Sequence, residues 1–99
     1  MKTYLISFTS PKYPSVNRKE ILDLLDTQTI IKNWYGIMPY AILVSSEDDI
    51  SSSDISKIIG GRFPSNLTFL VTETTSADGL ANKEVWDFIN KPKSSGRWK

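Results

Sequence analysis

Carboxylates are the side chains of this chain that could hold a metal ion, and the densest group is Glu47, Asp48 and Asp49, with Asp54 close behind. Carboxylate oxygens are ligands that Mg²⁺ and Ca²⁺ prefer. The spacing matches no calcium-binding loop, however, and acidic side chains also favour the positive end of a following helix. We therefore interpret the cluster as a solvated loop before a helix, and we assign no metal ligand.

Histidine and cysteine are absent from all 99 residues. Their absence excludes a disulfide, a thiolate nucleophile, a cysteine-ligated zinc ion and the usual base near neutral pH. Ser7 and Thr9 follow apolar residues but have no histidine that could activate their hydroxyls. Carboxylate-held Mg²⁺ or Mn²⁺, a perturbed lysine or a perturbed carboxyl group remain as routes to catalysis. We assign no catalytic residue and no cofactor.

Aromatic side chains at Trp34, Tyr35 and Tyr40 give a candidate binding surface. Such rings can stack on nucleic-acid bases when a sheet presents them. Surfaces of that kind usually interleave the rings with several cations, whereas Lys32 is the only cation near these three. Packing in a core or in a dimer interface is therefore the favoured interpretation.

Two further candidates are cationic. Arg62 follows two glycines, which allow a phosphate to approach the backbone closely, although a helix end followed by an exposed charge explains the same residues. Residues 91–99 contain four cations and no acid, so residues 1–90 carry a net charge of −3 within a total of +1. Arg97 and Trp98 in this segment could anchor in a pocket or an acidic groove of a partner, but a frayed terminus is the simpler interpretation.

Alternation of apolar residues predicts the strands. Tyr4, Ile6 and Phe8 share one side of an extended segment, which is typical of a strand with one buried face. Two segments rich in β-branched and aromatic residues flank Pro39, which belongs at a bend because it cannot donate a ladder hydrogen bond. The expected strands are residues 4–9, 30–38, 40–46 and 67–74.

Capping residues predict two helices. Asn17 is a good N-cap, and Ser51 with Asp54 three residues later forms the pattern of a capping box. Gly60–Gly61 predicts a left-handed end to the second helix. A short third helix is expected over residues 82–90, where apolar residues recur at helical spacing.

This order of elements predicts an α+β fold of the ferredoxin-like βαββαβ type: a four-stranded antiparallel sheet with two helices on one face, plus a short C-terminal helix. Residues 1–90 are expected to form this domain, and residues 91–99 a flexible basic tail. We expect the other face of the sheet to be buried against a second copy, against a partner or beneath the C-terminal helix. No apolar run approaches the roughly 20 residues of a membrane helix, and turn residues follow the start too early for a signal peptide, so we expect a cytoplasmic protein with no membrane contact.

Four segments carry a resemblance to a known group. "MKTYLISFTSPKYP", "NWYGIMPYAILVSSED", "ISSSDISKIIGGRF" and "NLTFLVTET" together resemble the Cas-two and VapD-like superfamily of small ferredoxin-like proteins, and short SinR-like bacterial and phage members are the most similar. The resemblance covers residues 1 to about 90 as a pattern of elements, and only the first eight residues match letter by letter. It implies a homodimer.

The resemblance also implies a place for catalysis, and the sequence departs from the pattern there. Nuclease-competent members carry an aspartate after the aromatic residue that ends the first strand, and two such aspartates hold a metal ion across the dimer. Phe8 aligns with that aromatic residue, so Thr9 stands in place of the aspartate. A neutral hydroxyl is a poor substitute for a charged magnesium ligand. The resemblance therefore implies the scaffold and the dimer but not the nuclease.

The sequence thus favours a non-catalytic binding protein that contacts a protein or a nucleic acid, in a phage, mobile-element or defence-related setting. One alternative is a Mg²⁺- or Mn²⁺-dependent endonuclease or toxin ribonuclease with displaced ligands such as Asp48, Asp49 or Asp78. Another is a subunit of a larger assembly. The candidate binding residues are Thr9, Lys32, Trp34, Tyr35, Tyr40, Arg62, Arg97 and Trp98.

Overall fold

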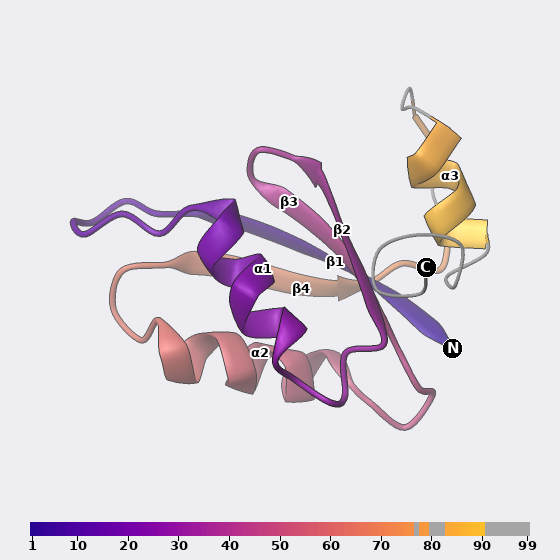
Figure 1. The fold of residues 1–99 in the computed structure, drawn as a ribbon, viewed down its shortest axis with the longest axis horizontal. Coiled ribbons are helices and arrows are strands. Elements are labelled where there is room, and N and C mark those ends of the chain that lie inside the picture. Colours follow the sequence, from indigo (N-terminus) through magenta and orange to yellow (C-terminus); the bar gives the residue numbers. More distant parts are fainter. Residues whose placement is uncertain (77, 80–82, 91–99) are drawn as a thin grey trace.

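The structure, a computed structural model, describes residues 1–76, 78–79 and 83–90. Four strands form one antiparallel sheet in the order β2-β3-β1-β4, and two helices pack on one face of it (Figure 1). This α+β architecture is compatible with a ferredoxin-like arrangement. The elements are β1 (Lys2–Thr9), α1 (Arg18–Asp26), β2 (Asn33–Met38), β3 (Ala41–Ser46), α2 (Ser52–Arg62), β4 (Thr68–Glu73) and α3 (Lys83–Asn90).

The main core lies between the sheet and helices α1 and α2. Tyr4, Ile6 and Phe8 of β1 are all buried on this face, as their alternation predicted. The Tyr4 hydroxyl donates to the backbone carbonyl of Ile50, which ties the loop before α2 to the centre of the sheet. Partner residues from the two helices and from β3 are Ile21, Leu25, Ile55, Ile59, Ile42 and Val44.

Both predicted helix starts are confirmed. The Asn17 side chain accepts a hydrogen bond from the backbone N–H of Glu20, at 3.0 Å, where α1 begins. Ser51 and Asp54 form the predicted capping box at α2, because each side chain accepts from the backbone N–H of the other. These contacts satisfy amide groups that the helix itself leaves without a partner.

The predicted helix end at Gly60–Gly61 is wrong. Helix α2 continues through both glycines to Arg62, and neither glycine has a positive φ. Phe63 ends the helix instead: it leaves the helical region while its side chain is buried, and Pro64 after it disfavours a helical conformation at Phe63. Glycine permits a left-handed end but does not require one.

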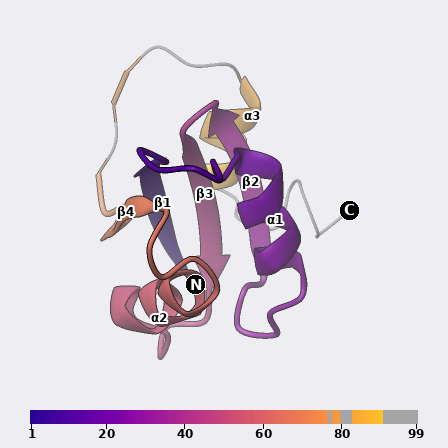
Figure 2. The same ribbon diagram turned by 90° about the vertical axis from the view of Figure 1, so that its left-hand side faces the viewer.

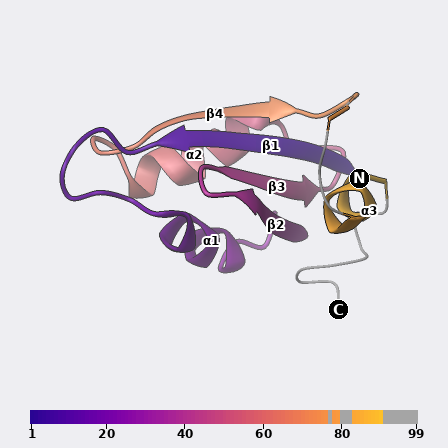
Figure 3. The ribbon, with the colours of Figure 1, turned by 90° about the horizontal axis from the view of Figure 1, so that it is seen from above.

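Helix α3 packs on the opposite face of the sheet. Phe88 is fully buried and its ring stacks on that of Tyr35, with 6.4 Å between the centroids. Val85 and Leu43 belong to the same small cluster. Figures 1 and 3 place α3 near the beginning of β1, apart from α1 and α2. This helix therefore covers only part of the second face, and Leu70 of β4 remains 66% exposed there.

Strands β2 and β3 are shorter than predicted. Strand β2 begins at Asn33, and Pro39 and Tyr40 form the turn to β3, so Tyr40 lies outside both strands. A register shift between Gly36 and Met38 interrupts the pairing just before this turn. Within the part of the chain that the structure describes, every helix is too short or too polar to cross a membrane.

Candidate functional site

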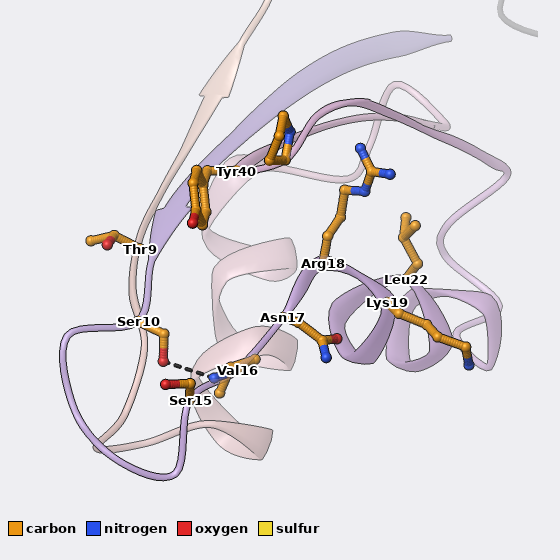
Figure 4. Close-up of a pocket in the computed structure, with 10 residues that line it drawn as sticks. Thr9, Ser10, Ser15, Val16, Asn17, Arg18, Lys19, Leu22 and Tyr40 are labelled. Carbon is orange, nitrogen blue, oxygen red and sulfur yellow. Dashed lines mark hydrogen bonds between the residues drawn. The ribbon is translucent and has the colours of Figure 1, made fainter.

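A groove of about 740 Å³ lies where β1 ends and α1 begins, beside the β2–β3 turn. Figure 4 shows Thr9 and Tyr40 on one side and Arg18, Leu22 and Lys19 on the other. Residues 9–22 and residues 39–40, which are distant in sequence, thus meet at one end of the sheet, and Figure 2 also shows the strands and α1 at this end. The lining residues are Thr9, Ser10, Ser15, Val16, Asn17, Arg18, Lys19, Leu22, Pro39 and Tyr40.

The Arg18 side chain lies against β2, where it donates one hydrogen bond and where Gly36 has no side chain that would displace it. Its Nη1 donates to the carbonyl oxygen of Met38 at 2.8 Å. A Cβ atom at Gly36 would lie only 3.0 Å from the Arg18 Nε, so glycine makes room for the guanidinium. Arg18 is half-buried and has no ion pair with any residue that the structure describes. A half-buried cation without a carboxylate partner favours an anionic ligand.

The first turn of α1 adds positive potential to the groove. Arg18 and Lys19 are the first two residues of this helix, where backbone N–H groups point out of the helix end. Lys19 is exposed, and its Nζ lies 2.9 Å from Asp23 Oδ2, a hydrogen bond that raises the pKa of Lys19. Lys19 therefore shares its charge with an acid, and Arg18 is the stronger candidate.

Tyr40 presents an open aromatic face at the groove. Its side chain is 66% exposed, and its ring makes an edge contact with Phe8, with 5.9 Å between the centroids. The backbone N–H of Phe8 donates to the Tyr40 carbonyl at 3.1 Å. The hydrogen bond ties the Tyr40 backbone to β1, and the edge contact with Phe8 supports one side of the ring.

The hydroxyls of the groove differ in their roles. Ser10 donates to the Asn66 carbonyl at 2.7 Å and accepts from the Val16 N–H at 2.8 Å, so it stabilises the loop before α1. Thr9 and Ser15 are exposed. No carboxylate is found among the described residues that line the groove, so the arrangement suits binding of an oxyanion beside a ring better than proton transfer.

The structure brings together two of the predicted binding residues, Thr9 and Tyr40, and separates the other aromatic ones. Trp34 packs against the main core, and its indole N–H donates to Asp26 at 3.3 Å. Tyr35, the next residue of β2, faces α3 instead. Successive side chains of a strand point to opposite faces, so Trp34, Tyr35 and Tyr40 form no common patch.

The remaining predicted cations lie away from the groove. Lys32 precedes β2, and its backbone N–H donates to the Ser45 carbonyl at 2.9 Å. Arg62 ends α2, with its guanidinium 5.0 Å from the centroid of the Phe63 ring. Arg97 and Trp98 lie outside the described residues.

Arg18 and Lys19 were missed as binding residues. The signal was present, because both follow directly on the predicted N-cap Asn17.

The acidic cluster is engaged in local contacts. Asp48 pairs with the N-terminal ammonium of Met1 at 3.1 Å. Asp54 accepts from the backbone and hydroxyl groups of Ser51, and these hydrogen bonds lower its pKa. Among residues 1–76, 78–79 and 83–90, no three acidic side chains are placed to hold a metal ion together.

Comparison of the chain with protein-family models, with curated proteins and with solved structures found no match. The resemblance to the Cas-two and VapD-like superfamily therefore remains an expectation that rests on the sequence segments alone.

Proposed function

We propose that the protein is a non-catalytic binding protein on a ferredoxin-like scaffold, and that its groove holds a short single-stranded segment of nucleic acid. One observation supports this most strongly: the half-buried Arg18 guanidinium has no carboxylate partner among the described residues and lines the same groove as the exposed ring of Tyr40. A phosphate suits the first group, and an unstacked base suits the second.

A single strand fits this groove better than a duplex. Base stacking on an aromatic ring requires an unpaired base, and Tyr40 offers an open ring at the sheet end. The loop that leads into α1 adds Tyr13, which is 94% exposed, and Lys12 beside it. Two exposed rings and several cations are therefore carried by the groove and by the loop next to it, and single-strand binding surfaces combine these two kinds of side chain.

The electrostatic contribution should be small. Residues 1–90 carry a net charge of −3, and only two cations line the groove. For a single strand, the logarithm of the binding constant falls by about 0.7 per neutralised phosphate for each unit of log salt. About two phosphates would therefore give only about a sevenfold loss of affinity between 50 and 200 mM salt.

The homodimer, the cytoplasmic location and the phage, mobile-element or defence setting are part of this proposal. The homodimer and the setting rest on the sequence resemblance, and the location rests on the lack of a membrane-length apolar run and of a signal-peptide pattern. The groove itself requires only one copy of the chain.

The test is a binding titration with labelled single- and double-stranded RNA and DNA, with and without Mg²⁺ or Mn²⁺. We expect single strands to bind without cleavage, with the small salt dependence given above. Metal-dependent cleavage that disappears when Asp48, Asp49 or Asp78 is replaced by Asn would instead establish the nuclease. No binding at low salt, together with capture of one specific protein, would favour a subunit of a larger assembly.

A further inference from the structure

The free edge of β4 is a second candidate interaction surface, and it lies apart from the groove. No described strand lies beyond β4, which ends the sheet order β2-β3-β1-β4. Its sequence, Thr-Phe-Leu-Val-Thr-Glu, contains no proline and no lysine, and it pairs with β1 without a register shift. Prolines, lysines and register shifts are common in edge strands, because they prevent pairing with another chain.

The opposite edge of the sheet shows the protection that β4 lacks. Strand β2 carries a register shift between Gly36 and Met38. The Met38 carbonyl of this strand already accepts a hydrogen bond from Arg18. A bulge and an occupied carbonyl both hinder pairing with another strand. Among the residues that the structure describes, the β4 edge carries neither feature.

The pairing of β4 with β1 shows which backbone groups face outward. The N–H of Thr74 donates to the Thr3 carbonyl at 2.8 Å, so every second residue back from Thr74 directs its backbone groups toward β1. Phe69 and Val71 therefore direct their N–H and C=O groups toward the free edge. Thr68, Leu70 and Thr72 place exposed side chains on the face opposite α1 and α2.

These residues complement a second copy of themselves. An antiparallel pair of β4 strands related by a twofold axis at Leu70 opposes Leu70 with Leu70, Thr68 with Thr72, and Phe69 with Val71. Apolar, Thr–Thr and aromatic–β-branched pairs are the cross-strand combinations that stabilise sheets. The one charge of β4, on Glu73, faces Leu67 in this register and lies 3.6 Å from Lys2 of its own chain. No like charges oppose one another.

We propose that two copies of the chain associate through β4, in antiparallel register with the twofold axis at Leu70, to form one continuous eight-stranded sheet. The outward N–H and C=O groups of Phe69 and Val71 then pair with those of the other copy. The exposed side chain of Leu70 packs against its symmetry mate. This inference rests on the homodimer of the proposed function and assigns its interface, whereas the binding groove contains no residue of β4.

Single cysteines test the register, because the natural chain contains none. Leu70 forms a pair without direct hydrogen bonds, in which Cα atoms lie about 4.5 Å apart, close enough for a disulfide. We expect Leu70→Cys to form a disulfide-linked dimer under mild oxidation. Thr68→Cys alone and Thr72→Cys alone should not, because equivalent residues lie about 13 Å apart along the strands. An equimolar mixture of these two variants should cross-link.

Thr29→Cys, at an exposed turn away from β4, measures random collision. The mass in solution, from light scattering of the unmodified chain, should be twice 11.2 kDa. Leu70→Lys should halve that mass, because it opposes two like charges, and should leave nucleic-acid binding unchanged. A monomer at high concentration would overturn the proposal. So would a dimer in which Leu70→Cys cross-links no faster than Thr29→Cys. A monomer would also overturn the homodimer of the proposed function, whereas the second result would overturn only the β4 interface. Neither result would contradict binding of nucleic acid in the groove, which requires only one copy of the chain.

Discussion

Replacing Gly36 with alanine should displace Arg18 without unfolding the protein. The added Cβ would lie 3.0 Å from Arg18 Nε and 3.1 Å from its Cδ and Cζ. Optimal van der Waals separations between such atoms are about 3.5–4.0 Å, so the guanidinium must move by about 0.5 Å or more. That movement lengthens or breaks the 2.8 Å hydrogen bond to Met38. Arg18 would keep its charge but lose its fixed position.

The change in folding free energy should be small, because two effects of similar size oppose each other. Loss of the Arg18–Met38 hydrogen bond costs about 1 kcal/mol. Replacing glycine at a residue without positive φ stabilises by about 0.4–1 kcal/mol, because the unfolded chain becomes less flexible. We therefore expect Gly36→Ala to change the free energy of unfolding by less than about 1 kcal/mol, as measured by urea titration.

Binding should respond more strongly than stability. Arg18→Ala removes a charged hydrogen-bond donor and should weaken oligonucleotide binding by about tenfold, as expected for an interaction worth about 1.5 kcal/mol. Gly36→Ala should weaken it by about threefold to fivefold, measured by fluorescence anisotropy, because only the placement of the cation changes.

Gly61→Ala is the matched control, since its added Cβ would meet no atom within 4 Å. If Gly36→Ala binds as tightly as the unmodified chain while Arg18→Ala binds more weakly, the fixed position of the Arg18 guanidinium does not matter for binding. If Gly61→Ala loses as much affinity as Gly36→Ala, the loss is not specific to the residue beside Arg18.

Three predictions concern stability. Phe88→Ala should cost about 3–5 kcal/mol in urea unfolding, because it empties the contact between α3 and the sheet, whereas Thr29→Ala, at an exposed turn, should cost less than about 0.5 kcal/mol. Burial raises the pKa of Tyr4, so the contribution of its neutral hydroxyl to stability should be lost as pH rises above about 10. Tyr4→Phe should remove this alkaline loss. It should also cost about 1 kcal/mol at neutral pH, because the Ile50 carbonyl loses its hydrogen-bond donor. Hydrogen bonds lower the pKa of Asp54, so its contribution is present above its ordinary pKa near 4 and is lost as pH falls through the lowered value; thermal melts of Asp54→Asn should therefore show a weaker dependence on pH at the acid end.

Local features of the fold were predictable from the sequence because their causes are local. The alternation of Tyr4, Ile6 and Phe8 identified the buried face of β1, and capping residues identified both helix starts. The helix end predicted at Gly60–Gly61 was wrong because the end of α2 depends on the burial of Phe63 against residues distant in sequence. Trp34 and Tyr35 could have been separated from sequence, since neighbours in one strand must face opposite sides.

The groove was not predictable in the same way. It requires the β2–β3 turn to lie beside the start of α1, and the Arg18–Met38 hydrogen bond joins residues 20 apart in sequence. The role of Gly36 depends on the same tertiary contact, because nothing in its sequence neighbours indicates that a guanidinium will lie against it. Only Tyr40 and Thr9 were identified in advance, each for a different reason.

An NMR titration of ¹⁵N-labelled protein with a short single-stranded oligonucleotide tests the central claim most directly. We predict that the largest amide shifts occur in residues 9–19 and 36–40, and that the Arg18 side-chain Nε–H shifts with them. Saturation at the affinity measured by anisotropy, with no cleavage of the oligonucleotide, completes the expected result. Shifts confined to residues 91–99 or to α3, with the groove unchanged, would contradict the account.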